Sequence, residues 1–324
     1  MIYYRNRPRA SYRQQQGVAL ITALLIAALV TVAAVAMASR QQLDIRRTGN
    51  MLEADQAYMY TLAAETWVTQ ILREDQQRSQ IDTLNEDWAM KLPPLPIEGG
   101  VISGSVEDMQ GRFNLNNLVD PNPTRQQTQI SIFRSLLNQV SLAEEKVTFS
   151  PFVPNRVADW IDPDLNSLAD GAEDLDYLNL DVPYRAANRF MASATELAAV
   201  AGVSLTDVNA LLPLVAALPD NTQVNVNTAP EMVLMSLNQD ITPQIAAELA
   251  EFRKETPFAQ VADFVTKLRD DYNITFDGTL ITVSSNYFLV SSDAAIGRTH
   301  LRMYSLLVRN SNAIDVVSRG IGTY

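Results

Sequence analysis

Near the start of the chain lies an apolar stretch, Val18–Ala38, that carries no charged side chain. A helix needs about 20 such residues to cross the hydrocarbon core of a bilayer. The only polar side chains within the stretch are Thr22 and Thr31, whose hydroxyls can bond back to carbonyls of their own helix. Apolar residues then recur at roughly helical spacing as far as about Arg73. The pattern predicts one long helix with an apolar first half.

The segment after this helix changes to a strand-like pattern. A proline-rich break at 92–96 leads to two segments of partial apolar alternation, residues 101–108 and 113–116. Residues 110–112, Gln-Gly-Arg, lie between them and favour a turn. We therefore predict that the two segments form a β-hairpin.

Helix-start signals are frequent between Pro121 and Tyr272. A serine or threonine three residues before an acid forms a capping box, and proline after threonine favours a first helical turn. These signals predict helix starts at Ser141, Ser193, Ser204, Thr228, Thr242 and Thr256. We expect a region of several short helices.

Extended segments return after Asp277-Gly278, with a turn at Gly297-Arg298. They are residues 280–283, 287–291, 299–308 and 314–318. A sheet begun at Val101 would then be completed by these last segments. We predict an α+β fold, in which a long N-terminal helix packs on an antiparallel sheet and a large all-α insertion interrupts the sheet.

The charges at the start of the chain predict its orientation and a processing site. Four arginines, at 5, 7, 9 and 13, precede the apolar stretch and should stay cytoplasmic, so that the chain beyond Arg40 faces outward. A secretory signal would end in a small-residue cleavage site, and Ala36–Ser39 is a weak one. Gly17, directly before the stretch, is the better candidate, because a protease can read its bare backbone at the membrane surface.

This arrangement resembles the type III signal of type IV pilins and of type II secretion pseudopilins. The resemblance implies that a prepilin peptidase cuts after Gly17 and methylates the new N-terminus at Val18. Thr22 stands at the fifth mature position, where these proteins usually carry Glu. That Glu would pair with the ammonium of a neighbouring subunit, so a chain without it suits the pilus tip. The opening Gly17-Val18-Ala19-Leu20 and the large size resemble the minor pseudopilin class called general secretion pathway protein K.

The resemblance implies a pilin-like fold with a helical insertion, and a division of the chain into five parts. These are a leader, 1–17; a transmembrane half-helix, 18–39; the first part of a pilin-like domain, 40–120; an inserted α-helical domain, 121–275; and C-terminal strands, 276–324. It also implies a single-pass protein of the inner membrane whose bulk is periplasmic. Expected partners are other minor pseudopilins in a tip complex, the prepilin peptidase, and secreted cargo or the outer-membrane channel.

The composition restricts the ligands. Asp and Glu number 37 against 25 Lys and Arg, and loss of the leader would remove four more bases. Such a surface repels nucleic-acid phosphates and anionic lipid heads, and favours divalent cations or basic partners. Cysteine is absent, so neither disulfides nor thiolate metal sites are available.

The best site candidate is an acidic cluster between 159 and 174. Its members are Asp159, Asp162, Asp164, Asp170, Glu173 and Asp174. Closely spaced carboxylates in a loop with Gly and Pro suit calcium, which takes six to eight oxygen ligands. The EF-hand spacing is missing, and helix caps in a solvated loop would give a similar composition. The protein K resemblance implies calcium binding here, with one or two ions.

Two other functions find little support. The segments 196–203, 206–214, 229–237 and 243–252 resemble helix-hairpin-helix units, which often bind DNA. The hairpin 238–241 has no glycine, and Arg253 and Lys254 are nearly the only bases nearby, so a packing or docking module is favoured. His300 is the only histidine and no catalytic pair stands out, so we predict that the chain is not an enzyme.

The sequence therefore predicts a minor pseudopilin at the tip of a type II secretion pseudopilus, which helps to start assembly and to export folded proteins across the outer membrane. Two alternatives remain at this point. A minor pilin of a type IV pilus would share the leader and helix, and a membrane-anchored DNA-uptake receptor would join one span to helix-hairpin-helix units.

Overall fold

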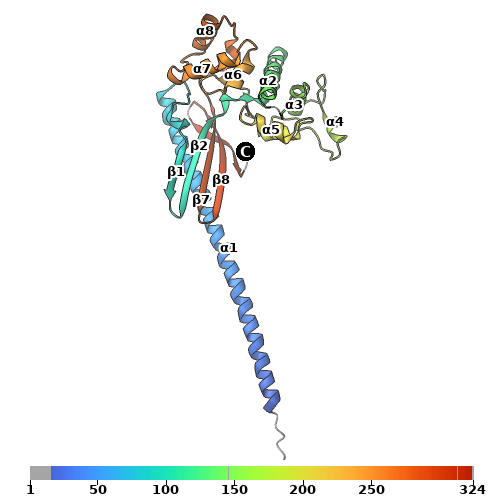
Figure 1. Ribbon diagram of the computed structural model, residues 1–324, viewed down its shortest axis with the longest axis vertical. Coiled ribbons are helices and arrows are strands. Elements are labelled where there is room, and N and C mark those ends of the chain that lie inside the picture. The colour runs from blue at the N-terminus through green and yellow to red at the C-terminus, as the bar shows by residue number, and fades with distance from the viewer. Residues whose placement is uncertain (1–15, 145, 312, 323–324) are drawn as a thin grey trace, which may run out of the picture. The chain divides into compact units, whose positions relative to one another are not determined.

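The computed structural model describes residues 16–144, 146–311 and 313–322 (Figure 1). The chain divides into two compact units, residues 1–55 and 56–324, which we describe separately. The predicted leader residues 1–15 lie outside the described part. Helix α1, Gln16–Arg78, begins in the first unit and ends in the second.

The first unit is, in its described residues, a single stretch of α1. Its apolar side chains from Val18 to Met37 are exposed. The Thr22 hydroxyl donates to the carbonyls of Val18 and Ala19, at 3.1 and 3.0 Å, and the Thr31 hydroxyl bonds the Ala27 carbonyl. Both threonines thus satisfy their hydroxyls within the helix. Among the described residues, α1 is the one helix that is both long enough and apolar enough to cross a membrane, as the sequence predicted.

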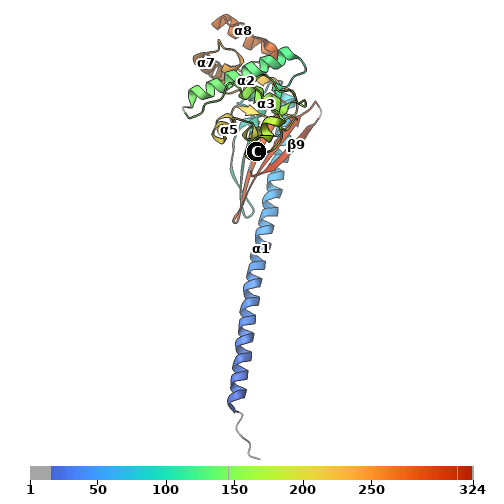
Figure 2. The ribbon, with the colours of Figure 1, turned by 90° about the vertical axis from the view of Figure 1, so that its right-hand side faces the viewer.

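The second unit is organised around a five-stranded antiparallel sheet with the order β1-β2-β7-β8-β9 (Figures 1 and 2). The strands are β1 Leu92–Ile97, β2 Gly100–Asp108, β7 Tyr287–Ile296, β8 Thr299–Arg309 and β9 Ile314–Ile321. The predicted turn at Gly297-Arg298 does join β7 to β8. The C-terminal strands complete a sheet begun before the helical region, as predicted.

The last turns of α1 lie on one face of this sheet. Ala57, Thr61, Glu65, Val68 and Leu72 recur every three or four residues and are buried. Glu65 accepts hydrogen bonds from the Ser305 hydroxyl at 2.6 Å and from the Arg319 guanidinium at 2.7 and 2.8 Å. An apolar stripe and one satisfied carboxylate therefore hold residues 56–78 to the sheet.

The predicted hairpin of residues 101–108 and 113–116 is wrong. β2 pairs instead with β1, across a turn at Gly99 whose φ of 80° suits glycine. The proline-rich segment is thus an edge strand, where missing N–H groups cost no ladder bonds. Residues 113–116 form the short strand β3, Phe113–Asn114, and the start of the 3₁₀ helix η3, Leu115–Leu118; β3 pairs in parallel with β4, Val215–Ala216.

A second short parallel pair corrects another prediction. The segment 280–283 contains strand β6, Ile281–Thr282, which pairs with β5, Val224–Asn225, and does not join the main sheet. Local alternation marks a strand but does not choose its partner, which packing over long sequence distances decides.

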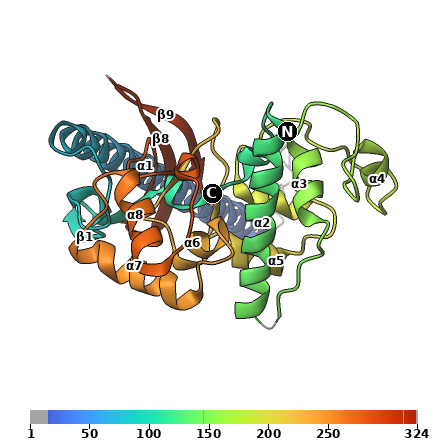
Figure 3. The same cartoon turned by 90° about the horizontal axis from the view of Figure 1, so that it is seen from above.

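The region between β3 and β6 is mainly helical. Its helices are α2 Pro123–Ala143, α3 Val153–Ile161, α4 Asp174–Leu178, α5 Leu205–Leu211, α6 Glu231–Leu237, α7 Pro243–Glu255 and α8 Val261–Tyr272. This region also contains the 3₁₀ turns η4 Ala194–Ala199 and η5 Gly278–Leu280, while η1 Asp87–Ala89 and η2 Met109–Gly111 precede β3. Seen from above, α6 to α8 gather on one side and α2 to α5 on the other (Figure 3).

Half of the predicted helix starts are confirmed. Ser193 and Ser204 form capping boxes, and Thr242 caps α7 with proline at its first position. Ser141 lies instead within the last turn of α2, and Thr256 follows the end of α7. The Thr228 hydroxyl donates to the buried Asp108 carboxylate at 2.5 Å, and α6 begins after Pro230. A tertiary partner has replaced the local cap there.

Asp108 ties the sheet to the helical region. Its carboxylate also accepts bonds from Ser285 Oγ at 2.6 Å, Asn225 Nδ2 at 3.0 Å and the Gln110 amide at 2.8 Å. Burial raises the pKa of Asp108, while the hydrogen bonds from Ser285, Thr228 and the Gln110 amide act to lower it. The group is therefore buried with its hydrogen-bonding capacity used, which is the condition for a stable buried carboxyl.

Candidate metal centre in the helical region

The acidic loop between α3 and α4 is anchored by Asp159. This residue lies on α3 and is fully buried. Its carboxylate accepts bonds from the amides of Leu168, at 3.1 Å, and Ala172, at 2.8 Å, and from the Ser167 hydroxyl. A Cβ on Gly171 would lie 1.8 Å from Asp159 Oδ2, so only glycine allows this approach. Asp159 therefore folds the loop back onto α3.

Three other carboxylates meet beside this anchor. Oxygens of Asp162, Asp164 and Glu173 lie within 4.8 Å of one another. Asp162 and Glu173 are buried, at 8% and 6% exposure. Within the described residues, Asp162 Oδ1 and both carboxylate oxygens of Glu173 have no hydrogen-bond partner. Buried carboxylates without partners are unfavourable, so the site offers unmet negative charge.

The pKa values of Asp162 and Glu173 reflect this unmet charge. Burial, and then the nearby Asp164 and Asp159 carboxylates, raise the pKa of Asp162 to about 6. Burial, followed by repulsion from Asp159, Asp162 and Asp164, raises the pKa of Glu173 to about 7. A bound cation would reverse these effects by pairing with the ionised oxygens. Hard carboxylate oxygens in a loop match the ligands that calcium takes.

The structure separates the remaining two predicted residues from this group. Asp170 is exposed and has a left-handed backbone, with φ of 59°. Asp174 accepts a bond from the Ala186 amide at 3.1 Å and pairs with Arg185 at 3.6 Å. Of the six predicted residues, three thus come together, Asp159 supports their loop, and Asp170 and Asp174 lie apart from the cluster.

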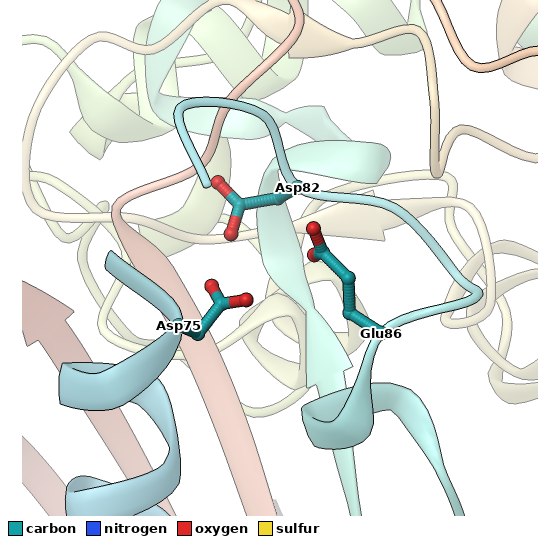
Figure 4. A group of neighbouring side chains, drawn as sticks. All are labelled: Asp75, Asp82 and Glu86. Carbon is teal, nitrogen blue, oxygen red and sulfur yellow. The ribbon is translucent and has the colours of Figure 1, made fainter. Parts of the chain in front are cut away.

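A second acidic group was not found by sequence reasoning. Asp75, Asp82 and Glu86 also place oxygens within 4.8 Å of one another (Figure 4). Arg309 pairs with Asp75 at 3.0 Å and with Asp82, and Glu86 accepts bonds from the Thr83 amide at 2.9 Å and Trp88 Nε1 at 2.7 Å. Burial, and then Glu86, still raise the pKa of Asp75 to about 6. The three acids follow one another closely in sequence, but nothing in the sequence indicates that Arg309 joins them.

The processing and tip-placement residues lie on α1. Gly17 and Val18 fall in its first turn, and Thr22 one turn further.

Comparison with known proteins identifies the family to which the chain is similar. The family described as type II secretion system protein K matches residues 111–220 and 224–271. A type II secretion system protein K of Pseudomonas aeruginosa is 37% identical over 320 residues, covering 96% of this chain and 94% of that protein. One from Aeromonas hydrophila is 32% identical, covering 93% and 95%.

A solved structure agrees with the fold. A chain from the crystal structure of the GspK-GspI-GspJ complex of the enterotoxigenic Escherichia coli type 2 secretion system superposes with a TM-score of 0.74. It is 26% identical in sequence, and the match covers 86% of this chain and all of that one.

A long N-terminal helix on an antiparallel sheet, apolar enough at its start for single-pass membrane anchoring, defines a pilin-like protein. The chain belongs to the type II secretion system protein K family and is a minor pseudopilin of that machine. These matches do not favour the type IV pilin or DNA-receptor alternatives. The family is a structural component of secretion, and the absence of enzymatic activity stays a prediction.

Proposed function

We propose that this chain occupies the tip of the pseudopilus and helps to start its assembly for the export of folded proteins. Membership of the protein K family carries the proposal. The chain would be held in the inner membrane by α1, with its bulk in the periplasm, after a prepilin peptidase has cut at Gly17 and methylated Val18. We propose the same domain division as the sequence predicts: a leader, a transmembrane half-helix, two pilin-like parts and a helical insertion.

The side chain at Thr22 supports the tip position. Its hydroxyl is already bonded to carbonyls of α1 and carries no charge. It cannot neutralise the ammonium group of a neighbouring subunit, and a charge buried in a membrane without a partner is costly. A subunit of this kind suits the end of the filament, where that pairing is not required.

The partners would be other minor pseudopilins of the same machine. The matched solved structure holds three secretion subunits in one complex. We propose that this chain forms the equivalent tip complex, with its helical region directed toward secreted cargo or the outer-membrane channel. The acidic composition makes nucleic acid an unsuitable partner.

Calcium would be held by Asp162, Asp164 and Glu173, as one or two ions. The unpartnered buried oxygens of Asp162 and Glu173 support this assignment. The ion would supply positive charge that offsets the repulsion among the carboxylates. Because Glu173 directly precedes α4 and Asp162 directly follows α3, the same ion would fix the loop between these helices.

The N-terminal mass of the membrane-extracted protein tests the pathway. We expect a mature chain that starts at Val18, and a Gly17→Leu variant that keeps its leader. Gly49→Leu is a matched control, since Gly49 also lies on α1 with nothing within 4 Å of its Cβ position. An intact Met1 start in the unaltered chain, or a cut near Ala38, would refute processing as a pseudopilin.

A further inference from the structure

The second unit contains an apolar groove of about 680 Å³ between α1, the sheet and the segment 85–93. Its walls include Ala64, Trp67 and Ile71 of α1, together with Met90, and its floor includes Val106 and Val290. Trp67 and Met90 are 50% and 64% exposed. Large apolar side chains at the mouth of a groove indicate a contact site more than a solvated surface.

The groove exists because the core beneath α1 is divided. One cluster contains Val68, Leu72 and Phe288, and another contains Ala57, Ile102 and Ala294. Between them on the same face, Gly104 is paired with Ser292. A Cβ on Gly104 would lie 2.6 Å from the Ser291 carbonyl oxygen, so a larger residue cannot fill the space from the sheet. The groove is therefore not filled by side chains of the sheet.

One end of the groove is negatively charged. Glu74, Asp75, Glu86 and Asp87 line it, against two bases, Arg78 and Lys91. Arg78 lies 3.4 Å from Glu74. Behind the lining, the Arg309 guanidinium serves both Asp75 and Asp82 and leaves the three-acid group of Figure 4 with excess negative charge. An occupant that ends in a positive charge would complete this group.

We propose that the groove receives, from a neighbouring minor pseudopilin, a large apolar side chain followed by a lysine or arginine. The inference rests on the proposed function for the existence of that neighbour. The apolar part would fill the space over Gly104 and Ser292 and contact Trp67. The basic part would lie at the acidic end. A buried anchor of this kind is typical of the few residues that carry most of the binding energy in an interface.

The hollow can be filled by mutation without touching the sheet. Ala64→Leu places a larger side chain in the groove, and Ala63→Leu places the same side chain on the exposed neighbouring position, outside the lining. Binding would be measured with full-length chains in detergent, by titration against each purified minor pseudopilin of the same machine. We expect Ala64→Leu to weaken binding of one partner by roughly tenfold or more, as for a blocked hot spot. Ala63→Leu should bind as the unaltered chain does.

The thermal unfolding midpoint of Ala64→Leu shows whether the fold tolerates the larger side chain. We expect a midpoint at or above that of the unaltered chain. Two rim variants decide the question if it is lower. Trp67→Ala should weaken binding of the same partner. Asp87→Lys should also weaken that binding, and by a smaller factor at high salt, because charge attraction at a surface is screened. Glu255→Lys, an exposed acid outside the lining, should have no effect.

The outcomes separate the two proposals. If the unaltered chain binds no minor pseudopilin, both the tip assembly and the groove assignment fail. If it binds, and the folded Ala64→Leu, Trp67→Ala and Asp87→Lys variants all bind equally well, the groove assignment alone is overturned.

Discussion

Glu173 should make a contribution to the stability of the calcium-free chain that becomes less favourable as the pH rises. Its pKa is about 7 in the folded chain, against an ordinary 4.5. Below pH 4.5 both folded and unfolded chains are protonated there, so the group has no effect. Between pH 4.5 and 7 the unfolded chain loses the proton and the folded chain keeps it, which favours unfolding. The shift corresponds to about 3 kcal/mol at about 1.4 kcal/mol per unit.

Glu173→Gln removes this ionisation. In the presence of a chelator at pH 8, we expect the variant to be more stable than the unaltered chain, by up to about 3 kcal/mol. At pH 4 the two should be alike. The Asp162 carboxylate contributes to the raised pKa of Glu173 and itself has a pKa raised to about 6, so the effects of the two groups on stability are not additive.

Calcium should make the unaltered chain more stable than Glu173→Gln at pH 8, the reverse of the order in chelator. The ion binds the folded, ionised site and stabilises the unaltered chain at pH 8 by mass action. Glu173→Gln should lose most of this response. Asp170→Asn is the matched control: Asp170 is exposed, lies outside the three-carboxylate group, and has a left-handed backbone that asparagine tolerates.

Denaturant unfolding of the full chain in detergent, with chelator or with calcium at pH 4 and pH 8, measures all four free energies of unfolding for each protein. The reasoning is refuted if Glu173→Gln has no advantage at pH 8 in chelator and still responds to calcium as the unaltered chain does. Loss of the calcium response in Asp170→Asn would instead show that the ligand set extends to that residue.

Three further predictions follow from single side chains. Asp108→Ala leaves the Ser285 hydroxyl and the Gln110 backbone amide without their acceptor, and urea unfolding should show a loss of several kcal/mol, at about 1–3 kcal/mol for each orphaned group; a loss below about 1 kcal/mol would contradict this. Gly171→Ala should displace the loop on Asp159 and weaken calcium binding in a titration, while Gly49→Ala should not. Thr22→Glu supplies the missing carboxylate, so crosslinking should find the variant within the filament as well as at its tip; a pattern confined to the tip would argue against the role of Thr22.

The sequence by itself determined the features that depend on neighbouring residues. The uncharged stretch from Val18 fixed the anchor helix, because crossing a membrane requires length and apolarity alone. The capping boxes at Ser193 and Ser204 formed as predicted, since all their atoms lie within one turn. The alternating segments at the C-terminus became β7, β8 and β9. The family could be inferred from the same local signals.

The tertiary structure decided which distant residues meet. β2 paired with β1 and β7, and β3 paired with β4, because a strand's pattern defines its buried face and leaves its partner open. Thr228 gave up a local cap to bond Asp108, which lies 120 residues earlier. Of the six acids in the predicted calcium cluster, only three converge; Asp159 bonds the loop backbone, and Asp174 pairs with Arg185.

The groove beside α1 belongs to the same category. It arises where Gly104 is paired with Ser292. The charge at its acidic end depends on Arg309, whose one guanidinium bonds both Asp75 and Asp82, more than 200 residues earlier in the chain. Periodicity records what each residue prefers to face, whereas cavities and shared charges depend on how several such faces fit together in three dimensions.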